Sequence, residues 1–360
     1  MWLFITVVYI MQRTVNLEEA RGRRDVDLNP EQFMNITEMI NYNGYPSEEY
    51  DVLTEDGYYL SLNRIPHGRE NPGSTGPKPV MLLQHGLTLD GSNWIANLPN
   101  NSLGFMVADA GYDVWLGNSR GNSWSRRHQS LSVDQEEFWD FSFHEMAMYD
   151  LPAMINFILN KTGQEKIYYA GHAQGCTIDF VAFSAMPELA QKIKMFFALG
   201  PLYTFQHTIG PVSYLLSLPE ALFKYLIWST NEENSNLNRT DVYISHFPDY
   251  TSVKNAIHLR QCAKTGELKC FDYGSKNNEK YNQSTPPFYK IKDMTVPTAV
   301  WSGGEDWVCH PEDTALSLPR ITNLVYHKSI SDWVHWDFIW GMDAAERMYK
   351  DVIAMMKKYS

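Results

Sequence analysis

The stretch Gly171-His172-Ala173-Gln174-Gly175 has the spacing of a turn that presents a catalytic nucleophile. A short apolar run, Ile167–Ala170, precedes it, and apolar residues at helical spacing follow it. A strand, a sharp glycine turn and a helix in this order hold a nucleophilic serine at the centre of the pattern G-x-S-x-G. Glycine permits the strained turn and the close passage of the strand and helix backbones. The pattern therefore indicates acyl-transfer chemistry at this turn.

The central residue of this turn is alanine, not serine. Ala173 has no oxygen that could attack a carbonyl carbon, so the chemistry that the pattern indicates lacks its nucleophile. Judged alone, the pattern fits an ordinary turn between a strand and a helix. The other parts of the chain have to decide between these two interpretations.

A second turn, His85-Gly86-Leu87, follows the apolar run that begins at Pro79. A continuous apolar run ended by glycine is typical of a buried parallel strand. In G-x-S-x-G enzymes the loop after such a strand donates one backbone N–H to the oxyanion hole, and the residue after the nucleophile donates the other. Leu87 and Gln174 are therefore the candidate donors. The alternative is a simple turn that ends a strand.

The elements around these turns alternate between strands and helices, which predicts an α/β fold with a mostly parallel sheet and helices on both faces. Strands are expected after Pro79, after Gly111, at Ile167–Ala170, after Lys194, at Thr298–Trp301 and at Leu324–His327. A hairpin is expected at Tyr50–Ile65, with its turn at Asp56-Gly57. Helices are expected near Met34–Ile40 and over Phe138–Lys161.

Five motifs give a specific resemblance: Gln84-His-Gly-Leu, Asn97-Leu-Pro-Asn-Asn-Ser-Leu-Gly-Phe, the run from Ala108 to Asn122, Glu137-Phe-Trp and Tyr149-Asp-Leu-Pro-Ala. In these motifs the chain resembles the acid lipase family, the gastric and lysosomal lipases, from about Met34 to the C-terminus. The resemblance implies an α/β-hydrolase fold, a Ser-Asp-His triad and hydrolysis of triacylglycerols or cholesteryl esters. No cofactor and no metal ion is expected.

Carried over by position, the family's acid falls on Asp306 and its base on His335. Each follows a late predicted strand, where a carboxylate can reach a histidine and fix its tautomer. The order of elbow, Asp and His along the chain is that of this fold. His310 is the rival base, but it stands too close behind Asp306 to lie on a separate loop.

Ala173 leaves three functional hypotheses open. The chain is a silenced lipase that binds acyl lipids without hydrolysing them, because loss of a triad nucleophile lowers kcat roughly a millionfold. Alternatively, it is an ordinary lipid ester hydrolase in which Ala173 is an engineered or variant residue. A third reading is a secreted interaction protein that uses an exposed apolar cap. Cys176 is a poor substitute nucleophile, because it lies about one helical turn further on.

Residues 1–20 are a candidate signal peptide, because Trp2–Met11 is apolar. The resemblance divides the rest of the chain: residues 21–201 and 251–360 form the hydrolase core, and residues 202–250 form a cap that is shorter than in the family. Leu215, Leu222 and Trp228 are candidates for contact with a lipid–water interface. A helix packed on the main domain is the alternative for this apolar run.

Composition limits the possible partners and compartments. A net charge of −12 argues against a nucleic-acid partner, because phosphate binding needs a basic surface. N-x-S/T sequons at Asn35, Asn100, Asn160, Asn238 and Asn282 favour the secretory pathway, with a secreted or lysosomal protein as the result. Cys262 and Cys270 could close a small disulfide loop there. No cysteine spacing indicates a zinc site.

Overall fold

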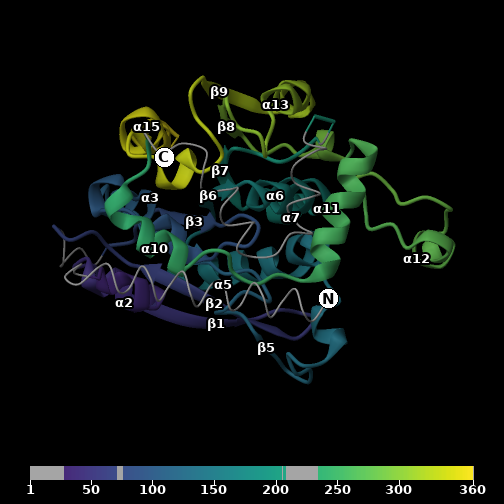
Figure 1. The fold of residues 1–360 in the computed structure, drawn as a ribbon, viewed down its shortest axis with the longest axis horizontal. Helices are drawn as coiled ribbons and strands as arrows, with labels where there is room; N and C mark the ends of the chain where they lie inside the picture. Colours follow the sequence, from purple (N-terminus) through teal and green to yellow (C-terminus); the bar gives the residue numbers. More distant parts are fainter. Residues whose placement is uncertain (1–27, 71–75, 205, 208–233, 360) are drawn as a thin grey trace, which may run out of the picture.

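The computed structural model describes residues 28–70, 76–204, 206–207 and 234–359, which form a sheet covered by helices (Figure 1). The predicted signal peptide and most of the predicted cap, including Leu215, Leu222 and Trp228, lie outside the described residues. The strands of the sheet are β1 (Glu48–Leu53), β2 (Tyr58–Ile65), β3 (Val80–Gln84), β4 (Asp113–Gly117), β5 (Arg127–His128), β6 (Ile167–His172), β7 (Ile193–Leu199), β8 (Thr298–Gly303) and β9 (Leu324–Ile330).

The strand order is β1-β2-β4-β3-β6-β7-β8-β9, with β5 paired to β2. The pairs from β4 to β9 are parallel, whereas β1 and β2 form an antiparallel hairpin that joins the sheet through β2 and β4. The predicted mostly parallel sheet and the predicted hairpin are therefore both confirmed.

Each central strand contributes side chains to two separate cores, because alternate residues of a strand point to opposite faces. In β3, Leu82 belongs to one core, and Met81 and Leu83 belong to the other. The described α-helices are α2 (Ile36–Tyr42), α3 (Leu103–Asp109), α4 (Phe143–Glu145), α5 (Leu151–Thr162), α6 (Gln174–Ala185), α7 (Pro187–Ala190), α10 (Thr240–Ser245), α11 (Val253–Thr265), α12 (Asn277–Tyr281), α13 (Pro311–Ser317), α14 (Asp337–Trp340) and α15 (Lys350–Lys358).

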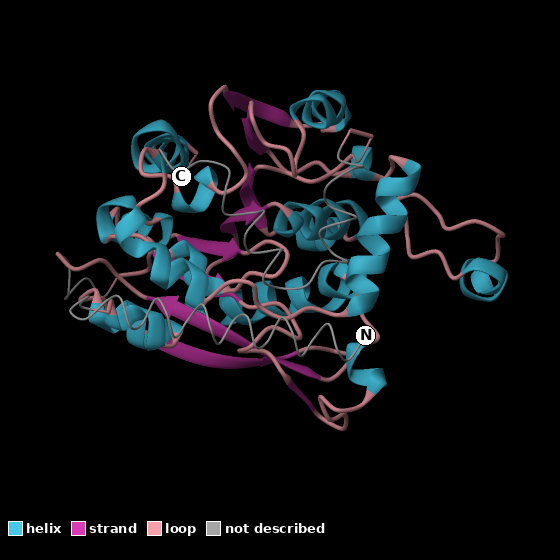
Figure 2. Cartoon of the chain, in the orientation of Figure 1, coloured by secondary structure: helices cyan, strands magenta, loops and turns pink. Residues whose placement is uncertain are grey.

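Figure 2 shows helices on both sides of the strands, as predicted. Helices α5 and α6 contribute to the core that contains Leu82, and α3 and α15 contribute to the other. In Figure 1 α3 and α15 lie to the left of the sheet and α6 and α11 to the right. None of the described helices combines the length and the apolar composition that crossing a bilayer requires.

The helix predicted over Phe138–Lys161 is wrong at its beginning. A short 3-10 turn ends at Trp139, and Ser142 then caps a new helical segment with its side chain. A π-helical turn over Met146–Asp150 leads into α5. The interruption arises because a serine hydroxyl that accepts backbone N–H bonds favours a helix start over a helix interior.

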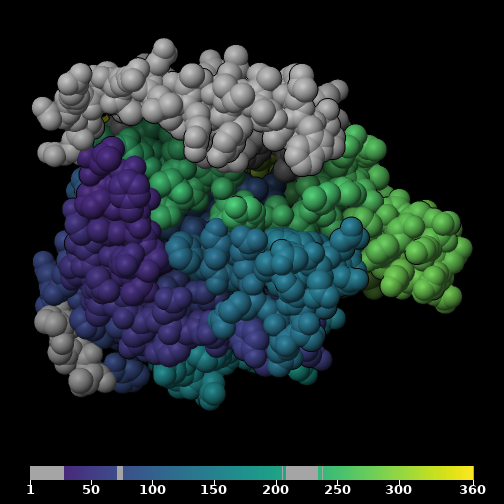
Figure 3. All heavy atoms as spheres, turned by 60° about the horizontal axis from the view of Figure 1, so that its bottom comes forward, coloured from purple at the N-terminus to yellow at the C-terminus, as the bar shows by residue number. Residues whose placement is uncertain are grey.

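A buried ion pair fastens the N-terminal segment to the segment that follows the predicted cap. Arg239 Nη2 lies 2.5 Å from Glu31 Oε2, and both side chains are almost fully buried. Arg239 Nε also donates to the carbonyl of Ala96. In Figure 3 the purple N-terminal residues accordingly lie beside the dark green residues of this segment, and the light green segment around α12 protrudes from the body.

The disulfide suggested by the spacing of Cys262 and Cys270 is not formed, because all four cysteines are free thiols. Cys262 Sγ lies 3.7 Å from the carbonyl oxygen of Lys269, and Cys270 contacts the Tyr289 hydroxyl. Burial raises the pKa of Cys262 to about 12, so its thiol stays protonated at neutral pH.

Candidate active site

The glycine turn lies between β6 and α6, at the carboxyl end of the parallel sheet. Ala173 has φ 53° and ψ −114°, a conformation that a non-glycine residue rarely adopts. A Cβ on Gly171 would lie 2.3 Å from Asp179 Oδ2, and a Cβ on Gly175 would lie 2.6 Å from the Gln84 carbonyl oxygen. The turn is thus strained at its centre and closely packed on both sides, as the sequence predicts.

The candidate acid and base meet at the ends of the last two strands, β8 and β9. Asp306 follows β8 and His335 follows β9, and Asp306 Oδ2 lies 2.9 Å from His335 Nδ1. Asp306 Oδ1 accepts the backbone N–H groups of Val308 and Cys309 at 2.9 and 2.8 Å. Because Nδ1 of the imidazole is the donor to the carboxylate, its Nε2 is left to accept a proton.

Two glycines allow the loops that carry this pair to approach each other. A Cβ on Gly303 would lie 2.5 Å from the Trp333 carbonyl oxygen, and one on Gly304 would lie 2.3 Å from the Ser331 carbonyl oxygen. Any larger residue would therefore push the Asp306 turn away from the loop that ends at His335. These glycines precede Asp306 in the motif Trp301-Ser-Gly-Gly-Glu-Asp, where their role is visible only in the fold.

His172 connects the glycine turn to the His335 loop, a contact that the sequence did not reveal. Its Nε2 lies 3.2 Å from the His335 carbonyl oxygen, and the two imidazole rings are 4.7 Å apart between centroids. Burial, followed by the charge of His335, holds the pKa of His172 well below its usual range. A neutral His172 therefore donates Nε2–H to that carbonyl and supports the loop next to Ala173. A histidine at the second position of the turn was its only sequence signal.

The loop that carries Leu87 and the start of the helix at Gln174, which hold the two predicted oxyanion-hole residues, both lie next to Ala173. A Cβ on Gly86 would lie 3.2 Å from the Cβ of Ala173, so the loop that carries Leu87 touches the turn. Gln174 is the first residue of α6, where backbone N–H groups have no acceptor within their own helix. Gly86, the neighbour of Leu87, and Gln174 thus approach Ala173 from two elements, and the donor roles of Leu87 and Gln174 stay predictions.

His85 holds the loop that carries Leu87. Its Nδ1 lies 2.8 Å from the Gly86 carbonyl oxygen, and its Nε2 accepts the Ser119 N–H at 3.0 Å. Complete burial lowers the pKa of His85, and the two contacts define a neutral imidazole with its proton on Nδ1. The histidine of the motif Gln84-His-Gly-Leu therefore has a positioning role.

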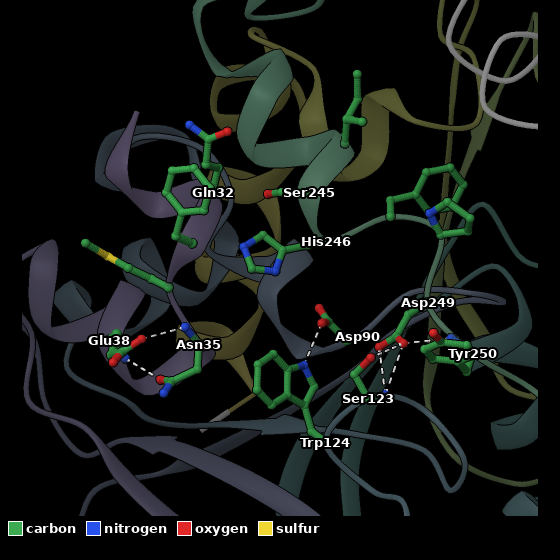
Figure 4. A pocket seen from close by; sticks show the side chains of 15 residues that line it. Gln32, Asn35, Glu38, Asp90, Ser123, Trp124, Ser245, His246, Asp249 and Tyr250 are labelled. Atoms are coloured by element: carbon green, nitrogen blue, oxygen red, sulfur yellow. Dashed lines mark hydrogen bonds between the residues drawn. The ribbon is translucent and has the colours of Figure 1, made fainter. Parts of the chain in front are cut away.

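A cavity of about 710 Å³ lies beside the same loop (Figure 4). Asp249, from the predicted cap, donates its backbone N–H to the Thr88 carbonyl oxygen at 2.7 Å. Its carboxylate accepts the Ser123 hydroxyl at 2.6 Å, and Trp124 Nε1 donates to Asp90 at 2.6 Å. None of these residues was predicted from the sequence, and both contacts of Asp249 join segments more than a hundred residues apart.

Three other residues, His310, Cys176 and Cys309, do not suit the reaction. His310 precedes α13, and its Nδ1 accepts the Glu312 N–H, whereas His335 holds the contact to Asp306. Cys176 is fully buried and directs its thiol at the Gly171 carbonyl oxygen. Cys309 is near Asp306, but burial and that carboxylate raise the pKa of its thiol, which therefore does not supply a thiolate.

Two families match the chain. The family described as alpha/beta hydrolase fold matches residues 79–342, and a partial alpha/beta-hydrolase lipase region matches residues 36–98. An esterase from Exiguobacterium antarcticum superposes with a TM-score of 0.59 at 13% sequence identity, over 86% of this chain and 100% of that one. The sheet, the turn and these matches define an α/β-hydrolase.

Full-length relatives narrow this class. Human Lipase member M is 52% identical over 99% of this chain and 93% of its own length, and human lysosomal acid lipase/cholesteryl ester hydrolase is 51% identical over 98% of both. The chain belongs to the acid lipase family, as its motifs predicted. The alignment with Lipase member M spans 396 positions, against 360 residues here, so that relative has residues without a counterpart. The shortened cap stays a prediction.

Proposed function

We propose that this protein is a silenced acid lipase, which binds acyl lipids at the candidate site but does not hydrolyse them. The observation that carries the proposal is the hydrogen-bonded pair of Asp306 and His335 beside a residue that has no attacking oxygen, Ala173. The family's reaction needs a covalent acyl-enzyme, and neither a histidine nor a backbone N–H can form the ester that a serine forms. Triacylglycerols or cholesteryl esters are the proposed ligands, and the name of the human relative, lysosomal acid lipase/cholesteryl ester hydrolase, supports the cholesteryl esters.

The same arrangement defines what a serine at position 173 would do. Its hydroxyl would attack the ester carbonyl while His335 Nε2 takes the proton, and Asp306 would stabilise the imidazolium that results. The N–H groups of Leu87 and Gln174 would stabilise the oxyanion. His335 would then return its proton to the leaving alcohol, and water would release the fatty acid by the reverse sequence. The second candidate function is therefore an active lipase in a form of this chain that has serine at position 173.

The test compares the chain as written with Ala173→Ser on short- and long-chain glyceryl esters and on a cholesteryl ester. We expect turnover from the serine form alone, and covalent labelling of the same form alone by a fluorophosphonate. Binding of a non-hydrolysable ether analogue is expected in both. Rapid hydrolysis by the alanine form would contradict the assignment of position 173. Failure of both forms to bind or hydrolyse would contradict the proposed function.

A secretory location is proposed with this function. Four of the sequon asparagines, Asn100, Asn160, Asn238 and Asn282, are exposed, and Asn35 is partly exposed, so all five are accessible to glycan transfer. The names of the lysosomal relatives support the same compartment. An endoglycosidase should increase the electrophoretic mobility of protein recovered from the medium or from lysosomes. Unchanged mobility would remove this support.

A further inference from the structure

A cluster of metal-ligating side chains lies outside the candidate active site, where the chain leaves the sheet towards the predicted cap. It consists of His207, His310 and Glu312, and one ligand atom of each lies within 4.8 Å of the others. We propose that these three residues bind a divalent cation of the zinc class. The site goes beyond the proposed lipid binding and uses none of its residues.

The first argument is the distance between His207 and Glu312. His207 Nε2 lies 3.0 Å from Glu312 Oε2. Two ligands of a tetrahedral zinc ion lie about 3.3 Å apart, because each metal–ligand bond is about 2.0–2.1 Å long. The side chains are 38% and 66% exposed, so a shift of a few tenths of an ångström meets little resistance. These two atoms therefore already have nearly the separation of two ligands of one ion.

The second argument is the carboxylate behind His207. Asp313 Oδ1 lies 3.2 Å from His207 Nδ1, and the Asp313 side chain is almost fully buried. Asp313 is itself held by the backbone N–H groups of Gln206 and His207, at 2.8 and 2.9 Å. A histidine that binds a metal usually donates its other ring N–H to a carboxylate in this way. The contact would orient the His207 ring in a metal-bound form, with Nε2 directed at the cation.

His310 completes the set from the residue before α13. Its ring stacks on that of His207, with 5.6 Å between centroids and 26° between planes. The hydrogen bond that its Nδ1 accepts from the Glu312 N–H is long at 3.3 Å, so binding an ion displaces little. Two imidazoles and one carboxylate suit zinc and similar transition metals better than magnesium or calcium. A water molecule would fill the fourth position.

The other cluster of this kind among the described residues, Asp306, Cys309 and His335, carries no such inference. Its carboxylate and imidazole are bonded to each other and belong to the candidate active site. The sequence did not predict this site, because His207 and the residues around Glu312 come from segments about a hundred residues apart. A cation there would join the start of the predicted cap to the helix that follows the Asp306 turn.

The experiment uses the full chain without an affinity tag, stripped of metal by a chelator and titrated with zinc chloride by calorimetry. One zinc ion per chain is expected, with a rise in the melting temperature when zinc is added. Cobalt(II) in place of zinc should give the visible bands of a tetrahedral site. His207→Ala and Glu312→Gln should each weaken zinc binding by at least roughly 10- to 100-fold, which is the usual effect of removing even a residue that only supports a metal ligand.

His67→Ala is the matched control, because His67 belongs to neither cluster of potential ligands. Its affinity for zinc should equal that of the unaltered chain. Glu312→Gln guards against misfolding, since this side chain is 66% exposed and its loss leaves the core intact. The site is wrong if the unaltered chain takes up no stoichiometric zinc. It is equally wrong if Glu312→Gln and His207→Ala bind zinc as tightly as His67→Ala does.

Discussion

Asp306 Oδ2 and His335 Nδ1 remain 2.9 Å apart, and both side chains are buried, although the residue that this pair would serve is alanine. The pair does not depend on a serine for its hydrogen bonds, because Asp306 Oδ1 accepts two backbone N–H groups of its own turn. A buried charge that lost its partner would be expelled or neutralised. Alanine at position 173 therefore leaves the candidate site assembled, with only the attacking oxygen missing.

The role of Asp306 can be measured in the serine form of the chain. Asp306→Asn in the Ala173→Ser background should lower kcat about 10⁴-fold, because the amide no longer holds His335 in the tautomer that accepts a proton. The assay is steady-state ester hydrolysis at neutral pH, with Ala173→Ser alone as the reference. His67→Ala in the same background controls for the loss of a titratable group elsewhere. Turnover by Asp306→Asn within tenfold of the reference would assign the acid to another residue.

The close passage of the turn and the neighbouring strand predicts an effect on stability. Gly175→Ala would place a Cβ 2.6 Å from the Gln84 carbonyl oxygen, and backbone on both sides prevents relaxation. We expect a loss of about 1–3 kcal/mol or more in the free energy of unfolding, measured by urea denaturation. Gly76→Ala is the control, since no atom lies within 4 Å of its added Cβ. Equal midpoints for the two variants would refute the packing argument.

Breaking the buried ion pair of Glu31 and Arg239 is expected to lower the free energy of unfolding by more than Gly175→Ala does. Arg239→Met leaves a carboxylate that is 2% exposed without its partner, which typically costs about 3–5 kcal/mol. Adding Glu31→Gln should recover part of that loss, because no buried charge then remains. The exposed pair of Lys350 and Glu346 is the control, and Lys350→Ala should change stability by less than about 1 kcal/mol. The stability of Arg239→Met, of the double variant with Glu31→Gln, and of Lys350→Ala is measured as the midpoint of urea unfolding at pH 7. If the double variant is no more stable than Arg239→Met, an unpaired buried charge is not the cause of the loss.

Local patterns predicted much of this fold. The glycines around Ala173 and the alternation of strands and helices follow from backbone sterics and from the spacing of apolar residues, and both act over a few positions. The helix predicted from Phe138 was wrong because apolar spacing continues across residues 140–142, whereas the Ser142 hydroxyl starts a new helix. Periodicity reports burial and does not reveal a cap that interrupts it.

Contacts between distant segments were not predictable in the same way. Two hydrogen bonds join segments more than 150 residues apart: one between His172 and the His335 carbonyl group, and one between Asp249 and Thr88. In the sequence, none of these residues differs from an ordinary surface or core residue. The family resemblance supplied Asp306 and His335, but it gave no information about residues that support them from other elements. Those assignments required the folded chain.

The last prediction concerns the Asp249 carboxyl group beside the oxyanion-loop residue Thr88. Burial, followed by the charge of Asp90, raises the pKa of Asp249 from 3.8 to about 6. The folded chain therefore holds this proton between about pH 4 and pH 6, whereas the unfolded chain has already released it. Stability consequently falls as the pH rises through this window, by up to about 3 kcal/mol from this group, since one pKa unit corresponds to about 1.4 kcal/mol.

Asp249→Asn removes this titration while keeping the shape of the side chain. The amide loses some of the bonds that Asp249 accepts from Ser123 and Tyr250, which adds an offset that does not vary with pH. The informative quantity is therefore the difference in unfolding free energy between the unaltered chain and Asp249→Asn, measured in urea at intervals from pH 4 to pH 7. As the pH rises to about 6, the unaltered chain should lose stability relative to Asp249→Asn, and above that pH the difference should stay constant. Asp134→Asn, at an exposed position, controls for the loss of one negative charge. A difference for Asp249→Asn that stays flat across the window would show that the buried carboxyl group does not hold its proton.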